Sequence, residues 1–263
     1  MGVTRSKIIL QDKIKNGVES RNITQINKIV SQMEKSICKI NNDKENKVGT
    51  GFFCKLPFPD RFNMLPVLIT CNHVLDKNSI AQGSKINFTL KNDEISKSIV
   101  INNSRRTYTS IEEEKDITII EINPQEDDIN KDSFLDVDED IDKDDVREIY
   151  QNKSVYMIHY EDGNITKESP GIISIIQQDQ IKFKHNCDSM DGSSGGPIIN
   201  SENNGVIGIH KGFFININYG ILLKLPIKEF YELHKNSKKI NIIRPTTTKI
   251  SDKGNFYVSN IYY

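Results

Sequence analysis

The sequence has little net charge, few cysteines and no long hydrophobic run, and each of these shortages excludes a class of protein. Lys and Arg number 35 against 36 Asp and Glu, for a formal net charge of -1, so no overall field would attract nucleic acid or an anionic membrane. No segment approaches the roughly 18 apolar residues of a membrane span, and the start lacks the apolar core of a secretory signal. We expect a cytoplasmic protein with no nucleic-acid partner and no stable membrane insertion. The start "MGVTRS" fits the loose pattern for N-myristoylation at Gly2, a short pattern that also arises by chance.

The four cysteines match neither a paired metal motif nor a dense disulfide scaffold; they are Cys38, Cys54, Cys71 and Cys187. Reduced thiols are the simplest interpretation. A bridge between Cys54 and Cys71 would join two neighbouring predicted strands, and only their geometry decides whether it forms.

Residues 1–33 are polar, with apolar side chains at roughly helical spacing: Ile23, Ile26, Val30, Met33 and Ile37. Asn22 could cap a short helix there. We interpret this N-terminal arm as packed on the domain that follows, with a partner-binding helix as the alternative.

What the chain does have is many short β-rich runs from Ser36 onward, separated by turns, with 36% hydrophobic residues overall. Such runs, with almost no helical pattern between them, predict an all-β sandwich or barrel. They fall into two sets of about six, which predicts two barrels. We expect the segments to be a first barrel, an acidic linker, a second barrel with a C-terminal helix, and a tail: 34–123, 124–149, 150–236 and 237–263.

The acidic linker and the C-terminal region carry weaker patterns. Asp136, Asp138 and Asp140 resemble the start of a calcium loop, but Ile141 and Arg147 occupy the positions of its Gly and its bidentate Glu. A solvated connection is the better interpretation. Later, "PIKEFYELHK" predicts a helix with Pro226 in its first turn, and "NFYVSNIYY" in the tail could add an edge strand.

Three polar residues stand at the ends of buried runs or in a loop of small residues. His73 follows a strand in "VLITCNHVL", Asp116 opens the strand "KDITIIEI", and Ser194 lies in "DGSSGGP". Each alone has a structural explanation. Together they fit acyl transfer, because a Ser hydroxyl needs an imidazole to take its proton, and that imidazole needs a carboxylate to fix its tautomer. Gly192 would let its own amide and that of Ser194 form an oxyanion hole.

The segments "GTGFFCKL", "LITCNHVL", "KDITIIEI" and "DGSSGGPIIN" together resemble the signatures of trypsin-like, chymotrypsin-fold serine proteases, from about Ser36 to His234. The resemblance implies two antiparallel six-stranded β-barrels with a C-terminal α-helix and a catalytic cleft between the barrels. It also implies a serine endopeptidase in which His73 is the general base, Asp116 orients it and Ser194 is the nucleophile. A protein or peptide would be the substrate.

In detail the motifs are similar to the bacterial branch of glutamyl endopeptidases and HtrA-type proteases. Digestive trypsins place an Asp before the nucleophile to receive a newly cut N-terminal ammonium, and here that position is Ser193. Activation by that ion pair is therefore not expected. Because residues 237–263 are too few for a PDZ domain, we do not expect an HtrA-like assembly.

The residues expected at the primary substrate pocket give conflicting indications. Asp188 matches the position that selects basic side chains in trypsins, whereas Ser189 and His210 match the positions that bind acidic side chains in glutamyl endopeptidases. Gly212 would line the same pocket, and strand alternation sends Lys211 to the opposite face. We favour an acidic or polar preference, with basic and broad preferences as alternatives.

The remaining histidines are most simply structural: His159 and His185 on strands, although His185 is close enough to line the pocket, and His234 on the C-terminal helix. No pair has zinc-ligand spacing, so we expect neither metal nor cofactor.

Two other hypotheses for the function stay open. The chain could be a silent protease-fold binding module, or a protease held inactive until a regulatory partner binds or residues 1–33 are removed.

Overall fold

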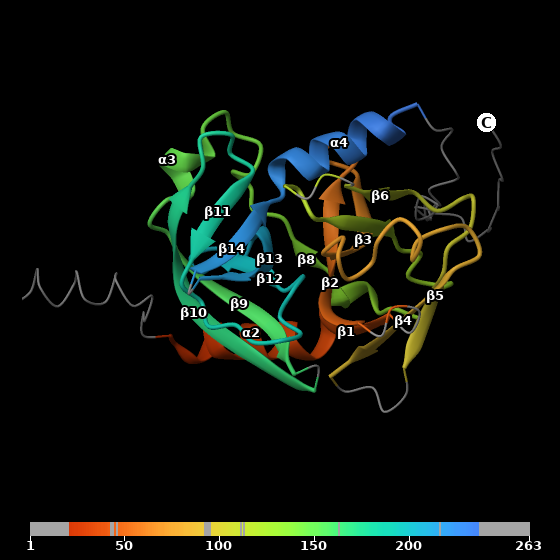
Figure 1. Ribbon diagram of the computed structural model, residues 1–263, viewed down its shortest axis with the longest axis horizontal. Coiled ribbons are helices and arrows are strands. Elements are labelled where there is room, and N and C mark those ends of the chain that lie inside the picture. Colours follow the sequence, from red (N-terminus) through yellow and green to blue (C-terminus); the bar gives the residue numbers. More distant parts are fainter. Residues whose placement is uncertain are drawn as a thin grey trace, which may run out of the picture.

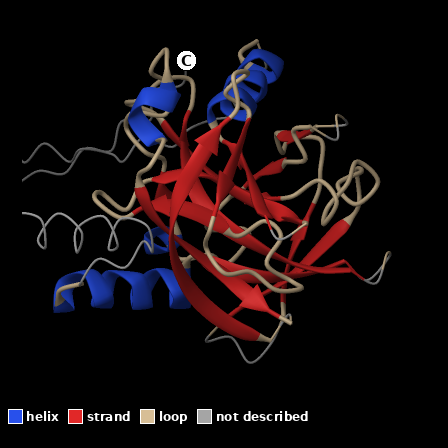
Figure 2. Cartoon of the chain, turned by 60° about the vertical axis from the view of Figure 1, so that its left-hand side comes forward, coloured by secondary structure: helices blue, strands red, loops and turns tan. Residues whose placement is uncertain are grey.

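The computed structural model describes residues 21–42, 45, 47–91, 96–110, 112, 114–162, 164–215 and 217–236. Strands dominate these residues, and the helices lie on the outside of the β framework (Figure 1 and Figure 2). The predicted all-β, chymotrypsin-like class is confirmed, and the two halves of the strand series form two separate sheets.

The first sheet is a half-barrel in the described part of the chain, with strand order β5-β4-β1-β2-β3-β7-β6 and β8 beside β2. Its strands are β1 (Ile37–Asn42), β2 (Lys47–Pro57), β3 (Met64–Thr70), β4 (Lys85–Leu90), β5 (Lys97–Val100), β6 (Thr107–Thr109), β7 (Thr118–Glu121) and β8 (Leu135–Asp136). The expected closed six-stranded barrel is not formed here, because the short edge strands β5 and β6 do not pair with each other. All neighbours along the path are antiparallel, and β8 is parallel to β2.

The second sheet is a closed barrel of six antiparallel strands in the order β10-β11-β14-β13-β12-β9. The strands are β9 (Ser154–Glu161), β10 (Ile165–Ile176), β11 (Lys182–His185), β12 (Pro197–Asn200), β13 (Val206–Phe214) and β14 (Ile217–Leu222). One continuous cluster of buried apolar side chains runs through both sheets, so the halves share a core.

The C-terminal helix α4 (Lys224–His234) follows β14 and returns to the first sheet, against β6 (Figure 1). Its first turn contains Pro226, as the sequence predicts. At its far end, His234 Nε2 donates to the Thr107 carbonyl at 3.0 Å. The helix therefore ties the two halves of the molecule together.

A helix also forms in the N-terminal arm, and only part of its expected apolar stripe is buried. In α2 (Ile23–Lys35), Asn22 caps the helix through a complete capping box with Gln25. Ile29 and Gln32 are buried. Of the expected apolar stripe, Ile23, Ile26 and Val30 are exposed, whereas Met33 and Ile37 pack against or into the core. The buried face is chosen by tertiary contact, because Gln32 Oε1 accepts the hydroxyl of buried Tyr156 at 2.8 Å.

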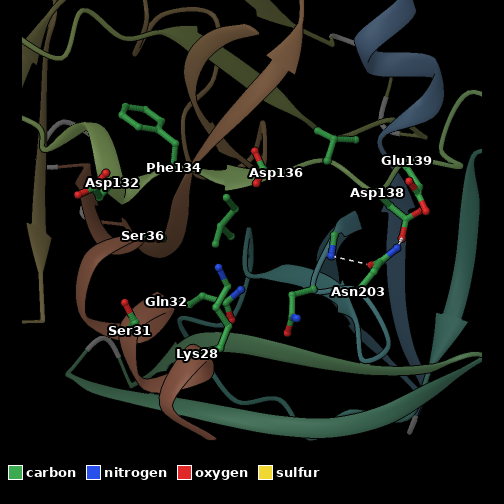
Figure 3. Close-up of a pocket in the computed structure, with 14 residues that line it drawn as sticks. Lys28, Ser31, Gln32, Ser36, Asp132, Phe134, Asp136, Asp138, Glu139 and Asn203 are labelled. Atoms are coloured by element: carbon green, nitrogen blue, oxygen red, sulfur yellow. Dashed lines mark hydrogen bonds between the residues drawn. The ribbon is translucent and has the colours of Figure 1, made fainter. Parts of the chain in front are cut away.

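In the acidic connection between the sheets, the carboxylate of Asp138 forms several hydrogen bonds that hold the segment in place. The connection contains η1 (Lys131–Ser133), β8 and α3 (Val146–Tyr150). Buried Asp138 accepts hydrogen bonds from Tyr150, Asn200 and the Asp140 backbone. It also accepts one from Asn203, which Figure 3 shows. Burial acts to raise the pKa of Asp138, but these hydrogen bonds outweigh it and lower the pKa below the usual value. The carboxylate is thus fully engaged in fastening the connection to the second barrel.

A buried ion pair braces the first sheet, and its loss is expected to be costly. Arg105 makes a bidentate contact with Asp127 at 2.8 and 2.9 Å, with side chains only 6% and 5% exposed. Replacing Asp127 by Ala leaves a buried, unpaired guanidinium, so we expect the free energy of unfolding to fall by about 3–5 kcal/mol. Denaturant unfolding measures this.

The neighbouring Asp128 supplies the control, because its side chain is 92% exposed in an ion pair with Lys97. Because Asp128 has a positive φ of 52° that Asn also tolerates, the control variant is Asp128→Asn, and we expect it to cost less than about 1 kcal/mol. Equal losses in the two variants would contradict the assigned role of the buried pair.

All four cysteines are buried free thiols, so the bridge considered between Cys54 and Cys71 is absent. None of the helices in the described ranges is long and apolar enough to cross a lipid bilayer.

Candidate active site

His73 and Asp116 come from two neighbouring strands of the first sheet and meet at the face toward the second barrel. His73 lies in the turn after β3, and Asp116 lies just before β7, which pairs with β3. Asp116 Oδ2 is 2.8 Å from His73 Nδ1, and Asp116 Oδ1 accepts the His73 backbone N–H at 2.9 Å. With Nδ1 donating to the carboxylate, the lone pair of the neutral ring is on Nε2. The His73 side chain is 46% exposed, whereas that of Asp116 is 8% exposed.

The Asp116 backbone has a positive φ of 33°. Asp and Asn enter this region more readily than most residues, yet it stays uncommon. In this conformation the Asp116 carboxylate contacts both the backbone N–H and the ring of His73. These two contacts fix the position of His73 and the tautomer of its ring.

Cys71 lies close enough to His73 and Asp116 for the three side chains to resemble a metal-ligand cluster. Burial, and secondarily the Asp116 charge, raises the pKa of the Cys71 thiol well above its usual value. The thiol hydrogen bonds to the His210 carbonyl with Sγ 3.3 Å away. Cys71 is therefore held as a buried thiol by its contact with the second barrel.

Ser194 lies on the loop before β12, where a glycine allows the two halves to approach. Gly195 has φ +91°, and a Cβ there would lie 2.1 Å from the Thr50 carbonyl of β2. Only glycine fits this contact. Ser194 Oγ donates to the Lys211 carbonyl at 3.2 Å; among the hydrogen bonds of the described residues, none joins it to His73.

Thr50, which the sequence motifs did not single out as functional, holds the Ser194 loop from the first sheet. Its backbone N–H donates to the Ser194 carbonyl at 2.9 Å, and its hydroxyl donates to the Gly192 carbonyl at 2.7 Å. The same hydroxyl accepts the Tyr160 N–H at 2.9 Å. Thr50 therefore fixes the loop relative to both barrels, and its place in the "GTGFF" motif was the available signal.

The direction of the Gly192 amide follows from a contact at the β9–β10 hairpin. The Asp191 carbonyl accepts the Asp162 N–H at 2.8 Å. The carbonyl and the N–H of one trans peptide point in opposite directions, so the Gly192 N–H is directed away from this hairpin. Sequence reasoning missed Asp162, because a loop contact distant in the chain leaves no local signature.

Asp188 and Ser189 line one hollow at the end of the second barrel, together with Met190, Phe213 and Asn218. Ser189 Oγ donates to Asn218 Oδ1 at 2.5 Å, and Asn218 Nδ2 donates to the Cys187 carbonyl at 2.8 Å. Asp188 is exposed. Gly212 lies on β13, paired with Tyr219 of β14, and no side chain fills the space where its Cβ would be.

His210 lies beneath this hollow, fully buried, rather than facing it as a free cation. Its Nδ1 is 3.0 Å from Nε2 of His185 on β11, which does line the hollow. Burial lowers the pKa of His210 well below its usual value and that of His185 to about 3. Both rings are therefore neutral near pH 7. Lys211 sits at an irregularity between His210 and Gly212, so simple strand alternation, expected from the sequence, does not apply there.

The buried His185 predicts an acid-sensitive fold. Its pKa is about 6.5 when unfolded and about 3 when folded, so between these values the unfolded chain binds more protons and the folded state loses stability as the pH falls. We expect the free energy of unfolding to decrease from about pH 6.5 toward pH 3. Urea unfolding at several pH values measures the slope, and His185→Leu should flatten it; an unchanged slope would contradict the assignment.

Comparisons with known proteins identify the family and the fold of this chain. The model of the trypsin-like peptidase domain matches residues 49–209. The structure is similar to a serine endoprotease from Yersinia pestis (TM-score 0.57, 15% identity, covering 83% of this chain and 69% of that one). It is also similar to Deg5 (TM-score 0.53, 16% identity, covering 80% of this chain and 95% of that one). A third similar structure is the Rv3671c protease of M. tuberculosis H37Rv in an inactive form (TM-score 0.52, 17% identity, covering 82% of this chain and 98% of that one). No curated protein sequence matches significantly.

Proposed function

Because the chain belongs to the trypsin-like peptidase domain family and is a serine protease, we propose that it cleaves peptide bonds through an acyl-enzyme on Ser194. His73 takes the proton of the Ser194 hydroxyl and later gives it to the leaving amine. Asp116 holds the ring and stabilises its charged form. The amides of Gly192 and Ser194 stabilise the oxyanion.

The observation that carries this proposal is the pair of hydrogen bonds that Asp116 accepts from the backbone N–H and the ring of His73. It presents the basic Nε2 of an accessible ring, as a general base requires. Thr50 donates hydrogen bonds to the carbonyls of Gly192 and Ser194. These bonds support the proposed oxyanion hole, because they fix the positions of the two residues whose amides would form it. The Ser194 contact with the Lys211 carbonyl is compatible with it, since catalytic hydrogen bonds are often long before substrate binds.

A fluorophosphonate probe tests the nucleophile directly. We expect covalent labelling of Ser194 in the folded chain and none in Ser194→Ala. Absence of labelling, under conditions that label trypsin, would contradict an active serine nucleophile.

For the residue before the scissile bond, we propose a polar, uncharged preference. His210 is neutral and bonded to His185, so it offers no cation to an acidic side chain. Ser189 and Asn218 offer hydrogen-bonding groups in the hollow. Beyond His210, β13 pairs only with β14 among the described strands, which leaves an edge where an extended substrate could add.

Cleavage of a diverse peptide library tests this preference. We expect Gln, Asn, Ser and Thr to dominate before the scissile bond. A profile dominated by Arg and Lys would instead assign the selection to the exposed Asp188 carboxylate, and one dominated by Glu and Asp would require a protonated His210.

The second candidate is a protease held inactive until a partner binds, and the position of Ser194 Oγ on the Lys211 carbonyl favours it. Removing residues 1–20 is the cleaner test of restraint by the arm, because α2 buries Ile29 and Gln32 and must stay. Equal turnover with and without residues 1–20 would count against restraint by that segment.

A further inference from the structure

Ser193 lies between the two amides proposed for the oxyanion hole, yet its side chain is buried inside the second barrel. The residue is 1% exposed. Its hydroxyl contacts two groups: the Met190 backbone N–H at 2.9 Å and Nδ1 of His159 at 2.8 Å. His159 lies on β9 and is 2% exposed. The proposed mechanism assigns no role to this buried pair of Ser193 and His159 side chains.

The hydroxyl closes a tight turn that contains one oxyanion donor. Ser193 N–H donates to the Met190 carbonyl at 3.1 Å, and the Met190 N–H donates back to Ser193 Oγ. Gly192 is the third residue of this turn and has φ +88°, as in a type II turn. Type I and type II turns differ by a flip of the central peptide, which here carries the Gly192 N–H. The Asp162 N–H holds the carbonyl of this peptide from outside the turn, and the contacts that fix the turn type hold the same donor from within.

His159 fixes the Ser193 hydroxyl in turn. The Ser193 oxygen accepts the Met190 N–H, and Nδ1 of His159 is the one acceptor within hydrogen-bond distance of the hydroxyl among the contacts of the described residues. We therefore assign the Ser193 hydrogen to Nδ1, which places the proton of the neutral His159 ring on Nε2. Burial lowers the pKa of His159 below its usual value, which keeps the ring neutral and able to accept.

We propose that His159 is a positioning residue for the oxyanion hole: by accepting the Ser193 hydroxyl, it holds the Met190–Ser193 turn in the form that presents the Gly192 N–H. The inference rests on the proposed function, because it assigns Gly192 to oxyanion stabilisation. A neutral, buried Ser–His pair then fixes the loop without a newly cut N-terminal ammonium. No cleavage of the chain is needed to form the hole.

Kinetics of peptide cleavage test the proposal. His159→Ala and Ser193→Ala should each lower kcat by about 10²-fold, the size of losing one oxyanion donor, with KM little changed. The double variant should lose no more than either single variant, because the two residues act as one unit. His159→Asn should recover most of the activity, since its Oδ1 stands close to the former Nδ1 and can accept the same hydrogen.

Tyr156→Phe is the matched control, because it removes a buried hydrogen bond from the same strand, to Gln32, far from the turn. It should lower the melting temperature and leave kcat unchanged. Folded His159→Ala with normal kcat would overturn the proposal, as would equal kcat losses in His159→Ala and Tyr156→Phe, or failure of His159→Asn to recover activity.

A readout without turnover separates this inference from the proposed function. In Ser194→Ala, ¹⁵N-histidine NMR should show His159 as the neutral Nε2–H tautomer, and Ser193→Ala should shift its Nδ1 resonance. A protonated Nδ1 would overturn the pairing. The expected tautomer in a wild-type chain that fails to label with fluorophosphonate would instead leave the pair standing and refute the peptidase mechanism.

Discussion

Replacing Ser194 by Ala should lower kcat for peptide cleavage by about 10⁴- to 10⁶-fold while peptide binding persists. The hydroxyl is the only group in the proposed mechanism that forms a covalent bond with the substrate. Its removal leaves the Gly192 and Ser194 amides in place, because Thr50 holds both carbonyls from the first sheet. Steady-state kinetics give the loss, and fluorescence anisotropy of a labelled peptide gives the binding.

Ser201→Ala is the matched control, since Ser201 follows β12 on the same segment and its backbone N–H already bonds the Ser154 carbonyl. It should retain wild-type kcat. Residual peptide cleavage above a hundredth of the wild-type rate in pure Ser194→Ala would assign the chemistry to another group.

Asp116→Asn should lower kcat by about 10⁴-fold with the fold intact. An Asn at this position can still accept the His73 backbone N–H through its oxygen. Its amide nitrogen would then donate to His73 Nδ1, which puts the ring proton on Nε2, the atom that must accept the Ser194 proton. The loss would come from the wrong tautomer rather than from lost packing.

Asp132→Asn removes a carboxylate from an exposed position in η1 and should leave kcat unchanged. The melting temperature of Asp116→Asn should stay near that of the wild-type chain. A large fall in melting temperature with proportionate loss of activity would instead make Asp116 a structural residue.

The sequence was sufficient for the fold class, and it supplied the candidate triad on which the proposed function rests. Alternating apolar residues in many short runs predict strands, and the "NHVL", "KDITIIEI" and "GSSGGP" segments carry His73, Asp116 and Ser194 because each role tolerates few residue types. Local periodicity also found α2, whose Asn22 and Gln25 form a capping box. It did not find which face of α2 is buried, because that depends on the bond from Tyr156, about 120 residues away.

Contacts between distant segments were decided only by the tertiary structure. The direction of the Gly192 N–H depends on Asp162 in a hairpin, and the Ser194 loop depends on Thr50 from the other sheet. His210 matched a pocket position by motif, but its charge is set by burial and by His185 on a neighbouring strand. The sequence likewise predicted His159 to be an ordinary strand residue, whereas in the structure its ring forms a hydrogen bond with the Ser193 hydroxyl. Residue types were enough to propose the reacting groups, whereas hydrogen-bond partners and protonation states depend on distances and burial that no local pattern encodes.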